Sequence, residues 1–204
     1  KGDSSRYTKY SNIITEIIRQ EVPLFEKTSI DEFYLDLTGM DKFFGCFKLT
    51  SEIRDTIIKE TGLPISFGLS INKTVAKVAT GEAKPNNRKE VPRGEDIPFL
   101  SPLSVQKIPM VGEKTTLMLS RMGIKKIRTL QQMPVQLMEK AMGKNGVVLW
   151  KKANGICNAP VIAYHEKKSI SLERTFQEDT THVEKLETLL IAMAENLAFQ
   201  LRQG

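Results

Sequence analysis

The spacing of apolar residues changes near residue 100, and this change restricts the fold more than any other feature of the sequence. Before it, stretches with helical spacing alternate with stretches in which every second residue is apolar. From Ser101 onward, short apolar runs are separated by glycines, namely Gly112, Gly123, Gly143, Gly146 and Gly155. We therefore expect a layer of helices and strands followed by a small helical part.

The periodicity also predicts the individual elements. Helical spacing predicts helices over residues 9–21, 43–60 and 182–202. Strict alternation predicts strands over residues 29–37 and 64–71. Few turns are of the hairpin type, so the first hundred residues are expected to form an α+β or α/β layer, with helices on one face of a sheet.

Three further segments complete the expected order. Asn72 is suited to cap a helix that directly follows the second strand. Residues 86–102 are rich in proline and predict a linker that could include an edge strand. Residues 157–173 are expected to form a tether.

The net charge of +6 is unevenly distributed along the 204 residues. Residues 1–100 are neutral overall, residues 101–170 have a net charge of +9, and residues 171–204 have a net charge of −3. Such a basic block is typical of proteins that bind the phosphate backbone of a nucleic acid. A basic surface that is merely solvated is the alternative.

Composition argues against several other classes. No apolar run approaches the ~20 residues of a membrane span, so no membrane partner is expected. Cys46 and Cys157 have neither CxxC nor zinc-site spacing, which favours a reduced, cytoplasmic setting. His165 and His182 are the only histidines, which argues against a His-based metal site or a serine triad.

Asp31 and Glu32 are adjacent acids beside an apolar run, where carboxylates need a partner, a metal or solvent. Mg²⁺ binds one or two protein carboxylates together with substrate phosphates and water. Neighbours on a regular strand point to opposite faces. The pair can therefore serve one site only at a strand entrance or a tight turn, or if one of the two acids acts indirectly, through a residue that itself binds the metal. Taken alone, an ordinary acidic surface turn is the simpler interpretation.

The next strand and helix favour a site. Ser66, Gly68 and Ser70 give the strand one small face, which would leave room for a nucleotide or a DNA end. At ~100° per residue, Lys73, Lys77 and Lys84 fall on nearly one helix face, with Lys84 at or past the helix end before Pro85. Such lysines could meet a triphosphate as point charges, although a solvated face is the common alternative.

The hairpin segment, residues 108–124, has the outline of half a helix-hairpin-helix unit. A turn leads to Gly112, a short helix follows, and Gly123 ends it. Free backbone N–H groups at a helix N-terminus bind phosphate without reading bases. The segment therefore predicts contact with a DNA backbone, and an ordinary glycine-capped turn is the alternative.

Four motifs in this order resemble the Y-family DNA polymerases of the DNA polymerase IV type. They are SIDEFYLDLTG (29–39), GLPISFGLSINKTVAKVATGEAKP (62–85), the IPMVG…MGI segment and SLERTFQED (171–179). The resemblance covers nearly all of the chain. The first two motifs together are highly specific, and the hairpin segment alone is not.

The resemblance implies the fold and the domain organisation. The expected class is α+β, a partial polymerase palm (a ferredoxin-like sheet with helices on one face) followed by a small all-α thumb with a helix-hairpin-helix. The palm would occupy residues 1–100, the thumb 101–162, a linker 163–173, and the beginning of the little finger 174–204. The family has its first metal-binding aspartate, its steric-gate aromatic and its fingers before the point that corresponds to Lys1.

The resemblance also implies residue roles. Asp31 matches a metal-binding aspartate, and Glu32 matches the acid beside the primer 3′ hydroxyl. Lys84 matches a lysine that contacts the incoming triphosphate, and Gly112, with Lys114 and Thr115, matches the thumb hairpin that holds a DNA phosphate. From the lysine face described above, Lys77 is expected to contact the triphosphate as well, and Lys73 is expected to bind DNA. Pro109 and Met110 depart from the family pattern, because the hairpin motif more often has glycine there.

The activity implied is template-directed, error-prone DNA synthesis at damaged DNA, with two Mg²⁺ ions per complete active site. Partners would be primer-template DNA and deoxynucleoside triphosphates, and a sliding clamp through regions beyond Gly204. The chain alone is expected to be catalytically inactive. The complete protein is expected in the bacterial cytoplasm, in association with the nucleoid. A nucleotidyl cyclase-like palm and a non-enzymatic DNA-binding module are the alternatives.

Overall fold

A computed structural model describes residues 4–41, 45–163 and 168–203 of the chain. The chain divides into two units, Lys1–Ala163 and Tyr164–Gly204, here called the core unit and the C-terminal unit. The predicted domain boundaries at residues 100/101, 162/163 and 173/174 stay predictions. No helix in the described ranges is long and apolar enough to cross a membrane.

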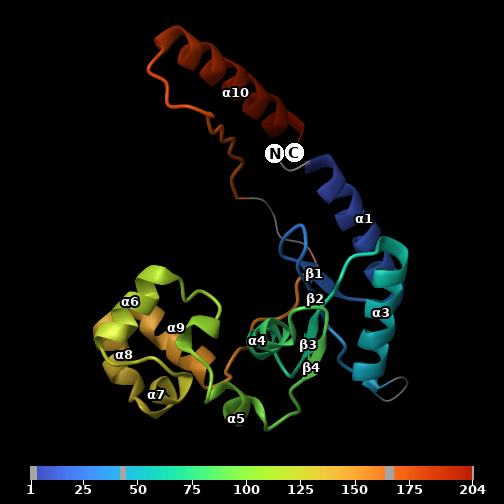
Figure 1. Ribbon diagram of the computed structural model, residues 1–204, viewed down its shortest axis with the longest axis vertical. Coiled ribbons are helices and arrows are strands. Elements are labelled where there is room, and N and C mark those ends of the chain that lie inside the picture. Colours follow the sequence, from blue (N-terminus) through green and yellow to red (C-terminus); the bar gives the residue numbers. More distant parts are fainter. Residues whose placement is uncertain (1–3, 42–44, 164–167, 204) are drawn as a thin grey trace. The chain divides into compact units, whose positions relative to one another are not determined.

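The first part of the core unit mixes helices with short strands (Figure 1). Its elements are α1 (Ser4–Glu21), β1 (Phe25–Lys27), β2 (Phe33–Leu35), α3 (Cys46–Thr61), β3 (Phe67–Leu69), α4 (Lys73–Ala83) and β4 (Arg88–Glu90). The expected helices and strands are present, although the strands are shorter than predicted. The expected start of the second helix at residues 43 and 44 lies outside the described residues.

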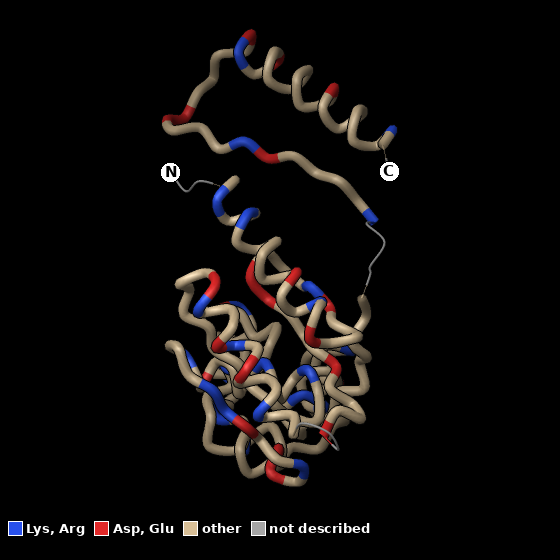
Figure 2. Tube along the Cα trace, turned by 90° about the vertical axis from the view of Figure 1, so that its right-hand side faces the viewer, with Lys and Arg blue, Asp and Glu red and all other residues tan. Residues whose placement is uncertain are grey.

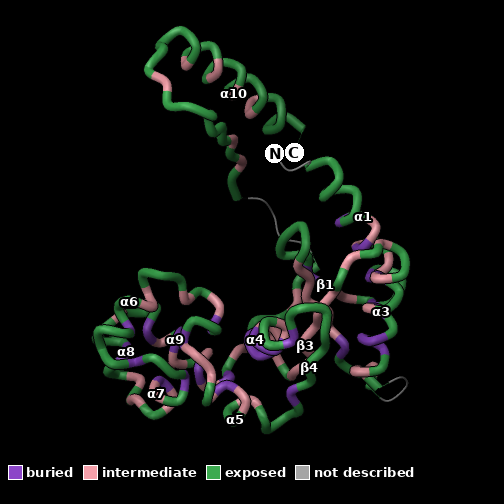
Figure 3. Tube along the Cα trace, in the orientation of Figure 1, coloured by how far each residue is buried: buried purple, intermediate pink, exposed green. Residues whose placement is uncertain are grey.

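The rest of the core unit is helical, and the C-terminal unit contains one long helix. The core-unit elements are α5 (Asp96–Leu100), the 3₁₀ turn η1 (Val105–Lys107), α6 (Glu113–Arg121), α7 (Ile127–Gln132), α8 (Val135–Met142) and α9 (Lys144–Ala153). In the C-terminal unit, α10 spans Val183–Gln203, and none of its described residues is buried (Figure 3). The α+β fold class is thereby confirmed.

The described strands form two pairs and not one continuous sheet. β1 and β2 are antiparallel, with Glu26 opposite Tyr34, and β3 and β4 are parallel, with Gly68 opposite Lys89. The β1–β2 hairpin was not predicted from the sequence, because β1 is too short to show an alternating pattern. The expected edge strand in the proline-rich linker is present as β4.

Two hydrophobic clusters hold the core unit together. In one, α1 and α3 pack on the β1–β2 hairpin through residues such as Ile18, Leu37 and Ile53. In the other, Val75 and Val78 of α4 pack with residues of the helical part such as Leu119. Burying one such aliphatic side chain contributes about 1.5–3 kcal/mol. The helix α4 therefore joins the mixed part of the core unit to the helical part.

The local sequence explains where α4 begins and how it lies on β3. The Asn72 side chain accepts a hydrogen bond from the Val75 N–H at 3.1 Å, which caps the helix as predicted. At Gly68, a Cβ atom would lie 2.5 Å from the Thr80 nitrogen and 2.6 Å from the Ala79 Cβ. Only glycine allows this close approach of helix and strand.

The small strand face is only partly covered. Ser66, Gly68 and Ser70 line a pocket together with Asp31 and Glu32, as the sequence suggested. At Gly68 the backbone of α4 also lies close to the strand. Ser70 Oγ donates to the Val91 carbonyl at 3.2 Å, and Ser66 Oγ accepts from the Asn87 N–H at 3.2 Å. These small residues hold α4 and the β4 segment, so their size has a structural reason.

We expect Gly68→Ala to lower the free energy of unfolding by about 3 kcal/mol, because the new methyl group would collide with backbone atoms of α4. Equilibrium unfolding in urea measures this change. Gly81→Ala is the matched control. Gly81 lies in α4 with open space at its Cβ position, so alanine there should raise the free energy of unfolding by about 0.5–1 kcal/mol. Equal effects at the two positions would contradict the close-packing explanation.

Candidate active site and nucleic-acid interface

The acid pair lies in the turn between β1 and β2, immediately before β2 begins. The Thr28 N–H donates to the Glu32 carbonyl at 3.0 Å and closes the turn. Ser29 Oγ donates to Asp31 Oδ1 at 2.6 Å. Because both acids precede the regular strand, the alternation of strand faces does not separate them.

Two lysines of α4, one helical turn apart, form ion pairs with the β1–β2 hairpin. Lys77 Nζ donates to Glu32 Oε1, and both side chains are more than one third exposed. One helical turn earlier, Lys73 Nζ lies 2.5 Å from Glu26 Oε2, with side-chain exposures of only 18% and 7%. An exposed ion pair contributes little to stability, whereas losing one partner of a buried pair is costly.

A pocket of about 850 Å³ brings four predicted site residues together. Asp31, Glu32, Lys77 and Lys84 all line it. Its walls also include residues of α1, β2 and β3, so it lies between the two strand pairs. Lys84 follows the last residue of α4, has extended backbone angles and is exposed. The predicted acid pair and triphosphate lysines therefore share one surface.

The same pocket contains two carboxylates but no larger acidic cluster. Among the described residues, no group of three or more His, Cys, Asp or Glu side chains could hold a metal ion. Two carboxylates match the donor set that Mg²⁺ uses when phosphates and water supply its other ligands. The residues present fit part of a magnesium site.

Sequence reasoning missed Glu26 and Tyr34, which lie opposite each other on β1 and β2. Lys73 Nζ lies 4.9 Å from the centroid of the Tyr34 ring. Burial raises the pKa of the Tyr34 hydroxyl, and the negative charges of Glu32 and Glu26 raise it further. The only signal for Glu26 was a single acid between Phe25 and Lys27, which does not distinguish a buried acid from an exposed one.

The hairpin segment presents the start of α6 to solvent. Gly112 is the N-cap of α6 and is exposed, and no side chain caps this helix end. Lys114 and Thr115 follow in the first turn of the nine-residue helix. The first N–H groups of such a helix are available to an anion. Figure 2 shows further Lys and Arg positions spread over several elements of the core unit.

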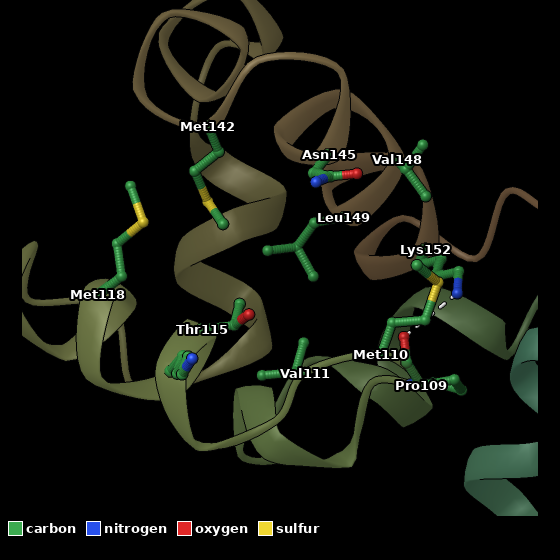
Figure 4. Close-up of a pocket in the computed structure, with 11 residues that line it drawn as sticks. Pro109, Met110, Val111, Thr115, Met118, Met142, Asn145, Val148, Leu149 and Lys152 are labelled. Carbon is green, nitrogen blue, oxygen red and sulfur yellow. Dashed lines mark hydrogen bonds between the residues drawn. The ribbon is translucent and has the colours of Figure 1, made fainter. Parts of the chain in front are cut away.

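Beside the hairpin segment lies a second cavity, of about 340 Å³. Figure 4 shows Val111, Leu149 and Met142 pointing into it from the hairpin segment, α9 and α8. Lys114 and Thr115 also line it. Lys152 Nζ donates to the Pro109 carbonyl at 3.2 Å, and burial lowers the pKa of the Lys152 ammonium. This bond joins the turn before α6 to α9.

Comparison with known proteins relates both ends of the chain to one family. The model of the impB/mucB/samB family matches residues 1–81, and the model of the C-terminal domain of that family matches residues 167–204. Together these segments make up more than half of the chain.

Similar full-length proteins and solved structures agree with the family models. A DNA polymerase IV of Dehalococcoides mccartyi is 36% identical over all 204 residues, which span 52% of that protein. A DNA polymerase IV of Shewanella amazonensis is 37% identical over 179 residues, 87% of this chain and 50% of that protein. The chain thus spans about half the length of these curated relatives.

Among solved structures, DinB from Sulfolobus solfataricus matches with a TM-score of 0.71 and 28% identity, over 78% of this chain and 48% of that chain. The insertion ternary complex of Dbh DNA polymerase matches with the same TM-score and identity, over 78% and 47% of the two chains.

We expect Met110→Gly to raise the free energy of unfolding by about 1 kcal/mol. Met110 has φ +81°, which favours glycine, and its side chain is 76% exposed, so little packing is lost. Urea denaturation measures the change. Met118→Gly, in the interior of α6, is the control and should lower stability by about 1 kcal/mol. Destabilisation by both glycines would show that Met110 is not strained.

Proposed function

Because the chain belongs to the impB/mucB/samB family of Y-family DNA polymerases, we propose that the longer protein is a DNA-directed DNA polymerase of the translesion, error-prone repair type. Its substrates are deoxynucleoside triphosphates and primer-template DNA. Its location is the bacterial cytoplasm, in association with the nucleoid. A sliding clamp is a further partner, through regions beyond Gly204.

The observation that supports this proposal best is the shared pocket. It is lined by an adjacent pair of carboxylates and by two lysines from the facing helix α4. Nucleotidyl transfer needs carboxylates for metal ions and cationic groups for the triphosphate, and this pocket offers both. Similarity to DNA polymerase IV over the whole chain favours this reading over a nucleotidyl cyclase or a DNA-binding module.

Each residue has a distinct proposed role. Asp31 and Glu32 would hold Mg²⁺, with Glu32 next to the primer 3′ hydroxyl. In a two-metal site, the ions lower the pKa of the attacking hydroxyl and neutralise charge on the leaving pyrophosphate. Lys84, which is exposed and has no described partner, is free to meet the triphosphate. Lys77 holds the Glu32 carboxylate and lies within reach of the same substrate.

The gap between the two strand pairs supports a further part of the proposal. β2 and β3 each have one hydrogen-bonded neighbour among the described strands, and both line the pocket. An open edge of this kind accepts another strand. In the longer protein, we propose that an apolar strand carrying a third metal-binding aspartate occupies this position.

DNA contact is proposed at the start of α6. Gly112, Lys114 and Thr115 would bind a backbone phosphate through N–H groups and the lysine charge, without reading the bases. Residues 1–100 would serve as palm, 101–162 as thumb, 163–173 as linker and 174–204 as the beginning of the little finger. The helix-hairpin-helix assignment of the thumb belongs to the same proposal.

We expect Asp31→Ala in the longer protein to reduce primer extension at least about a thousandfold, because losing a metal ligand removes several kcal/mol of charge stabilisation. Single-turnover extension of a labelled primer measures the rate. Asp41→Ala removes an exposed aspartate that does not line the pocket, and it should extend normally. Retained activity in Asp31→Ala would exclude the proposed role of Asp31.

The 204 residues alone should bind DNA weakly and should not extend a primer, because the third carboxylate would be lacking. Fluorescence anisotropy with labelled duplex DNA should show affinity that falls steeply with salt. A gel-based extension assay under the same conditions checks the second point. Primer extension by this chain would show that Asp31 and Glu32 suffice, and salt-independent binding would speak against phosphate contacts.

A further inference from the structure

The segment that leaves α9 is fastened to the beginning of α4. We call residues 155–162 the exit segment, because it ends one residue before the boundary of the core unit. It has no helix or strand, and most of its residues are exposed. Little apolar burial holds it in place, so its position depends on polar contacts.

These contacts come from three consecutive residues at the start of α4. Asn72 Nδ2 donates to the Gly155 carbonyl at 2.8 Å, and Lys73 Nζ donates to the Pro160 carbonyl at 3.1 Å. Burial raises the pKa of the Cys157 thiol, but polar interactions with Thr74 of α4 act against burial, and the pKa is lowered overall. The exit segment therefore follows the N-terminal turn of α4 along most of its length.

The ion pair of the buried Glu26 and the largely covered Lys73 lies at the centre of this arrangement. Glu26 Oε2 accepts from Lys73 Nζ at 2.5 Å and from the Ile162 N–H at 2.9 Å. One carboxylate thus binds both the helix and the last part of the exit segment. Charge-assisted bonds of this kind are about twice as strong as neutral ones.

We infer that Glu26 and Lys73 form an anchor that fixes the exit segment to β1 and α4, and with it the point where the tether to the C-terminal unit leaves the core unit. Both are positioning residues. Residues 167–204 match the C-terminal domain of the family. The following consequence rests on the proposed function. If the longer protein is a polymerase, the anchor determines the point at which a DNA-gripping domain is attached to the palm.

This inference gives Lys73 a role other than the predicted contact with DNA. Its ammonium donates to Glu26 and Pro160 and lies over the Tyr34 ring, and its side chain is only 18% exposed. To reach a phosphate, it would have to leave a buried carboxylate without its counter-charge, which is strongly unfavourable.

Amide hydrogen exchange at Ile162 in the full chain tests the anchor without any assay of activity. The variants are Glu26→Gln, Lys73→Met and the double variant. Each single variant should accelerate exchange at Ile162 about tenfold. The double variant should show a similar acceleration and not the product of the two, because both residues act through one anchor.

The matched control is Lys107→Met, which removes a different ion pair of α4, the 2.9 Å contact between Lys107 and Glu82. It should leave Ile162 exchange within about twofold. Three results would overturn the inference. Lys107→Met could accelerate Ile162 exchange as much as the anchor variants do, the single anchor variants could leave the exchange rate unchanged, or their effects could multiply in the double variant. If Lys73→Met does not fold, the test compares Ile162 exchange in the isosteric variant Glu26→Gln with Ile162 exchange in Lys107→Met.

Salt dependence of DNA binding by the same variants separates the two roles of Lys73. The anchor predicts the same salt slope for Lys73→Met, Glu26→Gln and the unchanged chain. A phosphate contact predicts that the slope falls by about one in Lys73→Met alone, which would overturn the inference. If neither the unchanged chain nor any variant binds DNA, the proposed DNA contact at the start of α6 fails, and the exchange rates at Ile162 still decide whether the anchor exists.

Discussion

The close contact between α4 and β3 at Gly68 is the constraint on which the rest of the core unit depends. It brings a helix backbone against a strand at a distance that any side chain would prevent. With α4 in that position, its buried face packs with the helical part, while Lys73 and Lys77 meet the β1–β2 hairpin. One missing Cβ atom thus determines the placement of the lysines around the candidate site.

The two ion pairs between α4 and the β1–β2 hairpin differ in burial, and this difference gives them different roles. Glu26–Lys73 is withdrawn from water and links three segments of the chain, so it is suited to hold structure. Glu32–Lys77 is partly open to solvent and lines the large pocket, so its members can exchange partners at low energetic cost. The spacing of one helical turn keeps the two functions separate on a single helix.

Much of this could be predicted from the sequence, for identifiable reasons. Apolar periodicity located the long helices, Asn72 marked the start of α4, and Lys84 was expected past its end. The adjacency of Asp31 and Glu32 became informative only together with the small strand face and the lysines that follow, because alone it favoured an ordinary acidic surface turn. Their placement in the turn between β1 and β2 was one of the arrangements that the sequence allowed.

What the sequence did not predict depends on contacts between distant segments. Glu26 and Ile162 are joined across most of the core unit, and no local pattern indicates that contact. The open face expected at Ser66, Gly68 and Ser70 does line the pocket, but a strand pattern did not show that α4 would also pack closely against Gly68. β1 was missed because its three residues are too few to establish a period.

The exit segment has a consequence for the order in which the molecule comes apart on warming. It is held by a handful of hydrogen bonds, whereas the helices on either side of α4 are held by buried aliphatic side chains. Regions with few buried contacts open at lower free energy than packed cores. Heat should therefore release the exit segment from α4 and β1 while the hydrophobic clusters of the core unit are still packed.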